Sequence, residues 1–97
     1  MLTVILSSVG NADFRQDPSR PLPGVPRRRQ KIKDIVEASK TCLAYIAGYE
    51  LGSGNWNGGD VFDERGQKVA SVSYNGVVWP PGKWSPGVVP LYKPQPD

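Results

Sequence analysis

The stretch KVASVSYNGVVW, residues 68–79, carries the clearest hairpin signal in the chain. Asn75 and Gly76 both tolerate a positive φ, as the two central residues of a tight hairpin turn must. A turn at these two residues predicts that Val72, Tyr74, Val77 and Trp79 form one apolar face. Residues 60–63 and the turn signal at 64–67 precede this hairpin, so residues 60–79 predict a three-stranded meander.

A further strand is predicted at the N-terminus. Residues 2–6, LTVIL, form a short apolar run that suits a strand covered on both faces. Residues 11–26 hold four prolines without any periodicity, and we expect a long surface loop that acts as a lid or binding arm. The tail at 80–97 is also rich in proline but contains Trp84, Leu91 and Tyr92, which predicts docking on the same domain or on a neighbouring subunit.

One strong amphipathic helix is predicted between these parts. Pro26 suits the first turn of the helix. The helix is predicted to end near Gly48 or, if Leu51 packs back against the helix, at Gly52 as a left-handed cap. The predicted apolar stripe consists of Ile32, Ile35, Val36, Ser39, Leu43 and Ile46, with Ala44 and Ala47 beside it. The sequence therefore predicts a single α+β domain over residues 1–97. One helix packs on a small, mostly antiparallel sheet formed by the N-terminal strand and the meander.

The amino-acid composition limits the kinds of catalytic and metal-binding sites that the chain can form. The chain has no histidine, which removes the usual general base and the commonest metal ligand. Cys42 is the only cysteine, so an intrachain disulfide is excluded and a zinc site is strongly disfavoured, and we expect Cys42 to be a small buried residue. No stretch predicts a signal peptide or a membrane span, and cytoplasmic location is the default. We expect Asp60, Asp63 and Glu64 to be polar residues of turns and of the hairpin, and we expect a binding protein that uses no catalytic residue, metal or cofactor.

Positive charge is concentrated in one segment. The whole chain carries +3, but residues 15–33 carry +6. Arg27, Arg28 and Arg29 stand where the predicted helix begins, an end that already carries partial positive charge. A phosphate or carboxylate held there would resolve this conflict. The alternative is a solvated basic face.

Two loops are candidates for the remaining walls of such a site. Gly10 and Asn11 follow the first strand in a small turn that could leave N–H groups for a phosphate. Residues 52–59, GSGNWNGG, permit close backbone approach, and Trp56 is either a stacking surface for a base or a plug for the core. Four further candidates could complete the pocket, although both tyrosines could equally be core residues: Tyr45, Asn55, Asn57 and Tyr74.

Residues 7–13, SSVGNAD, resemble the opening strand and loop of Rossmann-like domains that sense cyclic oligonucleotides in CRISPR systems. The strand–loop–helix–hairpin order, with residues 44–46 and 52–59, is similar to small phage-encoded anti-Thoeris proteins. That resemblance implies sequestration of a cyclic ADP-ribose signal, without hydrolysis, by a homo-oligomer.

We therefore expect a cytoplasmic protein that binds a small phosphorylated nucleotide and counteracts anti-phage immunity. One alternative is a small phage inhibitor that binds a CRISPR effector or another nucleic-acid-associated complex through its basic segment. Direct nucleic-acid binding is less favoured, because an extended duplex needs a broader basic surface. A structural assembly protein is the third alternative.

Overall fold

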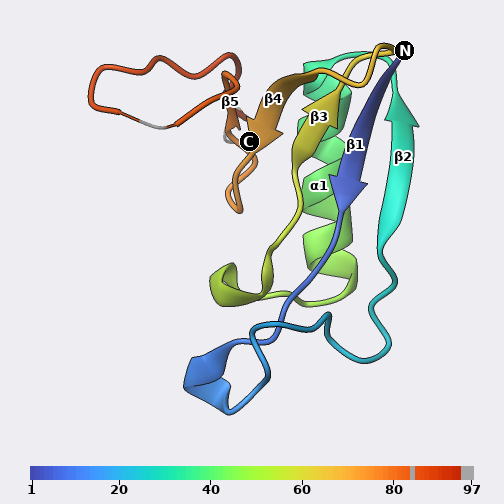
Figure 1. The fold of residues 1–97 in the computed structure, drawn as a ribbon, viewed down its shortest axis with the longest axis vertical. Coiled ribbons are helices and arrows are strands. Elements are labelled where there is room, and N and C mark those ends of the chain that lie inside the picture. The colour runs from blue at the N-terminus through green and yellow to red at the C-terminus, as the bar shows by residue number, and fades with distance from the viewer. Residues whose placement is uncertain (84, 95–97) are drawn as a thin grey trace.

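A five-stranded antiparallel sheet and one helix form the fold of the computed structural model, which describes residues 1–83 and 85–94 (Figure 1). The strands lie in the order β2-β1-β3-β4-β5. Their bounds are Leu2–Leu6 for β1, Arg28–Ile32 for β2, Asp60–Phe62 for β3, Lys68–Val72 for β4 and Val78–Trp79 for β5. Helix α1 spans Ile35–Gly48, and short 3-10 turns cover Ala12–Phe14 and Ser53–Asn55. The predicted α+β class is confirmed, with β2 as an additional strand.

The hairpin between β4 and β5 forms at the predicted residues but with a different register. Val72 pairs with Val78 and Ser71 with Trp79, so the loop contains three residues, Tyr74 to Gly76, and Gly76 has φ +84°. A two-residue turn would have paired the strands one position away. A shift of one residue exchanges the two faces of a strand. Val78 is therefore fully buried in the core, and the prediction that Val77 and Trp79 face the helix is wrong. Tyr74 lies in the loop and is 39% exposed.

The arginine triplet does not begin the helix, and this prediction is also wrong. Residues 28–32 pair along the whole of β1, with Leu6 opposite Arg28 and Leu2 opposite Ile32. Helix α1 starts at Ile35, where the Asp34 side chain accepts a hydrogen bond of 2.9 Å from the Glu37 N–H. An aspartate followed three residues later by a glutamate is a known helix-start signal, and here it overrides the signal of Pro26.

The helix buries a stripe that differs in part from the predicted one. The fully or largely buried residues of α1 are Ala38, Ser39, Cys42, Tyr45 and Ile46. Ile32 belongs to β2, while Ala44 and Ala47 are exposed. The helix ends at Gly48, the first of the two predicted ends. The prediction of Gly52 as a left-handed cap when Leu51 packs back is wrong, because the left-handed residue is Glu50, with φ +52°. Leu51 packs back into the core, and its N–H donates to the Ile46 carbonyl at 2.9 Å.

The two long segments fold back on the domain. In the tail, the Val78 N–H donates to the Tyr92 carbonyl at 2.9 Å, and the Tyr92 side chain packs on the core. This confirms docking on the same domain for this part of the predicted tail, whereas residue 84 and residues 95–97 lie outside the described residues. In the proline-rich loop, the Leu22 N–H donates to Ser8 Oγ at 3.0 Å. No helix within the described residues is long and apolar enough to cross a membrane.

Helix α1 covers only one face of the sheet (Figure 1). Val4, Val61 and Val72 face α1 and belong to the core. We call the opposite side the outer face; within residues 1–83 and 85–94, no second helix or sheet covers it. Ile5 on the outer face is nevertheless only 6% exposed, and Val4 and Leu6 on the other face are buried, so the expectation that β1 is covered on both faces is confirmed for residues 4–6.

Candidate functional site

The Gly10 loop and the Trp56 loop lie side by side at one end of the sheet. The Val9 N–H donates to the Asn55 carbonyl at 2.9 Å, and Ser8 forms an isolated bridge with Trp56. Gly54 lies so close to Asn11 that any side chain at Gly54 would collide with the Asn11 amide. The two predicted walls therefore do meet in space.

These loops direct their polar groups toward each other. The Gly10 N–H donates to the Arg20 carbonyl at 3.0 Å, and the Asn11 N–H donates to Gln16 Oε1 at 2.9 Å. The Asn55 amide donates to the Val9 carbonyl at 3.0 Å and to Gln16 Oε1 at 3.1 Å. Asn57 is exposed, and its N–H donates to the Ser7 carbonyl. Because the N–H groups of Gly10 and Asn11 already have partners, a phosphate would have to displace contacts that hold the loops together.

The predicted aromatic residues also have structural partners. The Trp56 indole N–H donates to the Val72 carbonyl at 3.1 Å, and its ring centroid lies 6.0 Å from that of Tyr45. The Tyr45 hydroxyl donates to the Pro26 carbonyl at 2.7 Å, and burial raises the pKa of Tyr45. The Tyr74 hydroxyl donates to the Leu51 carbonyl at 2.9 Å. These contacts favour the interpretation of Trp56 and Tyr45 as core residues.

The arginine triplet is divided between the two faces of the sheet. Arg28 lies opposite Leu6, on the side of α1, and its guanidinium donates to the Tyr49 hydroxyl at 3.3 Å. Arg29 lies opposite Ile5, on the outer face. Arg27 precedes β2 and is exposed. Neighbouring side chains of a strand point to opposite faces, so an extended triplet cannot present all its charges to one ligand pocket.

On the outer face, Arg29 shares a hollow with a second cation and an aromatic ring. Arg29, Lys31 and Phe62 contribute to the lining of a cavity of about 400 Å³. Lys31 pairs with Thr3 and Thr3 with Phe62, so these side chains occupy neighbouring positions on three strands. This arrangement can hold an anion beside an apolar group.

Two carboxylates, Asp63 and Glu64, also line this cavity and have partners of their own. Glu64 forms an ion pair with the amino group of Met1, whose hydrogen bond and charge lower the pKa of Glu64. Asp63 Oδ1 accepts hydrogen bonds of 2.9 Å from the Arg65 and Gln67 N–H groups. The expectation that Asp63 serves in a turn is confirmed. Both contacts reduce the repulsion that these carboxylates would exert on a bound anion.

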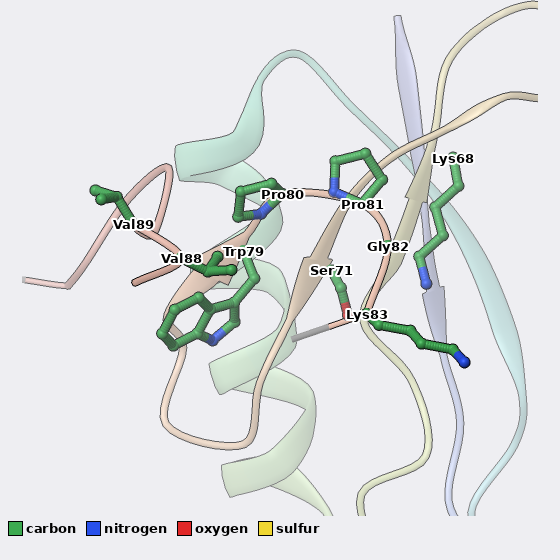
Figure 2. Close-up of a pocket in the computed structure, with 9 residues that line it drawn as sticks. All are labelled: Lys68, Ser71, Trp79, Pro80, Pro81, Gly82, Lys83, Val88 and Val89. Carbon is green, nitrogen blue, oxygen red and sulfur yellow. The ribbon is translucent and has the colours of Figure 1, made fainter. Parts of the chain in front are cut away.

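A second hollow lies at the other end of the outer face (Figure 2). It has a volume of about 480 Å³ and is lined by Trp79, Pro80, Pro81 and other residues of β4, β5 and the tail. Lys68 and Lys83 border it in the close-up, and Lys68 Nζ lies 3.0 Å from Asp60 Oδ1. Trp79 faces this hollow because of the three-residue turn described above.

Lys31, Phe62 and Trp79 line these hollows but were not among the predicted site residues. The alternation of residues 28–32 in an edge strand would have identified Lys31 as a partner of Arg29. The position of Trp79 depends on the hairpin register, which the Asn-Gly signal alone does not determine. Phe62 carries no local signal, because its face is set by pairing with Thr3.

Cys42 is fully buried in the core, as expected, and burial raises the pKa of its thiol to about 12. A thiol of that kind is a poor nucleophile at neutral pH. Within the part of the chain that the structure describes, no group of three or more acidic or cysteine side chains could hold a metal ion.

Comparisons with protein-family models, with curated proteins and with solved structures gave no match for this chain.

Proposed function

We propose that this protein binds a small phosphorylated nucleotide on the outer face of its sheet and does not convert it chemically. The observation that carries the proposal is the cavity that brings Arg29 and Lys31 next to Phe62. Arginine holds phosphate oxygens in a bidentate manner, and lysine adds a point charge. An aromatic ring offers a surface for a base.

The spacing of the two cations suits more than one phosphate oxygen. Arg29 and Lys31 are two residues apart on one strand, so their Cα atoms are separated by about 7 Å. Their side chains reach the cavity from the edge strand, while Phe62 reaches it from β3. A phosphate near the edge and a base toward the centre of the sheet is the orientation that we propose.

Sequestration is the proposed mode of action. The absence of histidine from the sequence and the high pKa of Cys42 favour binding over nucleophilic or general-base catalysis. The resemblance to anti-Thoeris proteins supports a cyclic ADP-ribose or cyclic oligonucleotide signal as the ligand. In this proposal a homo-oligomer acts in the cytoplasm, that of the host cell if the protein is phage-encoded.

The test is calorimetric titration with cyclic ADP-ribose isomers and with cyclic di- and trinucleotides. Arg29→Gln should weaken binding of the active nucleotide by tenfold or more. Arg28→Gln is the matched control, since it removes the same charge from the adjacent residue on the opposite face, and its affinity should stay within about twofold of the wild type. Chromatography of the recovered nucleotide should show it unchanged.

Two results would contradict the proposal. If Arg28→Gln weakens binding as much as Arg29→Gln, the outer face is not the site. If none of these nucleotides binds, but single-stranded DNA or RNA gives a salt-sensitive shift in a gel, the nucleic-acid alternative replaces it.

A further inference from the structure

The two edges of the sheet differ in how they are covered. The edge at β5 is occupied by the chain's own tail, where Leu91 and Tyr92 exchange hydrogen bonds with Val78. The edge at β2 pairs with no other segment among residues 1–83 and 85–94. A strand in this position presents N–H and C=O groups that another strand could pair with.

The charged side chains along this edge are all positive. Residues 27–33 contain Arg27, Arg28, Arg29, Lys31 and Lys33 and no acidic residue. The four residues 28–31 are all exposed. Because the strand alternates, a cation lies on each side of the pairing edge: Arg28 toward α1, and Arg29 and Lys31 toward the outer face. A strand added at this edge would meet positive charge on both of its faces.

Charge also selects the kind of strand that can bind. A second copy of β2 would place cations opposite cations about 5 Å apart, which is destabilising. This repulsion disfavours self-association through the β2 edge, a common use of lysine and arginine at sheet edges. The same charges attract an acidic strand.

We infer that β2 is a docking edge for an extended acidic segment of a partner protein, which adds to the sheet as a sixth strand. Main-chain hydrogen bonds would supply affinity, and acidic side chains on alternate residues would pair with the cations of β2. The inference goes beyond the proposed function, since it uses the backbone edge of β2 rather than the cavity on the outer face.

The test is fluorescence polarisation with a labelled, acetylated peptide in which Glu and Val alternate. Its matched control is a peptide of the same sequence with an N-methyl group on every residue, which keeps the charge but removes the N–H donors from both edges of the strand. The unmodified peptide should bind at least about tenfold more tightly than the N-methylated one, or ~1.4 kcal/mol. A peptide alternating Lys and Val should not bind.

Two protein variants separate the edge from general electrostatics. Arg27→Gln/Arg29→Gln/Lys31→Gln should lose at least tenfold in affinity for the Glu-Val peptide. Arg15→Gln/Lys40→Gln/Lys93→Gln has the same net charge but an intact edge, and should bind within about twofold of the wild type. Hydrogen exchange should show that backbone N–H groups within residues 27–33 become protected on binding.

Equal affinity of the N-methylated peptide would overturn the inference, because β2 would then attract charge without pairing. Failure of the unmodified peptide to bind at low salt would overturn it as well. Neither result bears on nucleotide binding, which is measured separately with Arg29→Gln and Arg28→Gln.

Discussion

The register of the β4–β5 hairpin can be tested by truncating two adjacent valines. Val78 is fully buried and belongs to the core, whereas Val77 is half-buried and points away from it. Val78→Ala removes two buried methyl groups, worth ~1.6 kcal/mol of transfer free energy. The cavity left behind raises the expected loss of unfolding free energy to about 2–3 kcal/mol.

For a domain of this size that loss lowers the melting temperature by about 10–20 °C. Val77→Ala is the matched control and should cost less than about 1 kcal/mol. Chemical unfolding followed by the fluorescence of the tryptophans measures both variants. A two-residue turn at Asn75 and Gly76 would reverse the order, so a larger loss for Val77→Ala than for Val78→Ala would refute the three-residue register.

Three further outcomes follow from the helix and its core. Asp34→Ala removes the side chain that caps α1 and should lower the unfolding free energy by about 1 kcal/mol; an unchanged value in urea unfolding would contradict the capping role. Glu50→Gly relieves a left-handed residue at φ +52° and should stabilise by roughly 0.5–1 kcal/mol, while Glu50→Ala should not; equal effects in thermal unfolding would show that Glu50 is unstrained. Because burial raises the pKa of Cys42 from 9.0 to about 12, the folded state keeps its thiol protonated where the unfolded chain ionises. This contribution to stability is fully present below about pH 9 and declines between pH 9 and 12, so Cys42→Ala should flatten the pH dependence of unfolding; an identical slope in both proteins would contradict it.

Much of the fold could be predicted from local signals. The meander, the N-terminal strand and the end of the helix each carry turn or cap residues close in sequence. Strand β2 could not be found in the same way, because its four exposed polar residues, followed by a helix, resemble a solvated helix start. The Asp34-to-Glu37 spacing was the local signal that separates the two interpretations, and it places the arginines before the helix rather than in its first turn.

The candidate site was harder to predict, because it depends on pairing between distant segments. Contact between the Gly10 and Trp56 loops was anticipated, but the partners of their polar groups depend on Gln16 and Arg20, which carried no signal. The cluster on the outer face can be predicted only when the register of β1 with β2 and β3 is known, because that register places Arg29, Lys31 and Phe62 together.

The most direct test of nucleotide binding on the outer face is an NMR measurement of intermolecular nuclear Overhauser effects, made with the nucleotide that binds in calorimetry. We expect nuclear Overhauser effects between the base protons of the ligand and the ring of Phe62. We expect none to the ring of Trp56, which packs against Tyr45 on the side of α1. Contacts to Trp56 without contacts to Phe62 would contradict binding on the outer face and place the site at the loops at the end of the sheet.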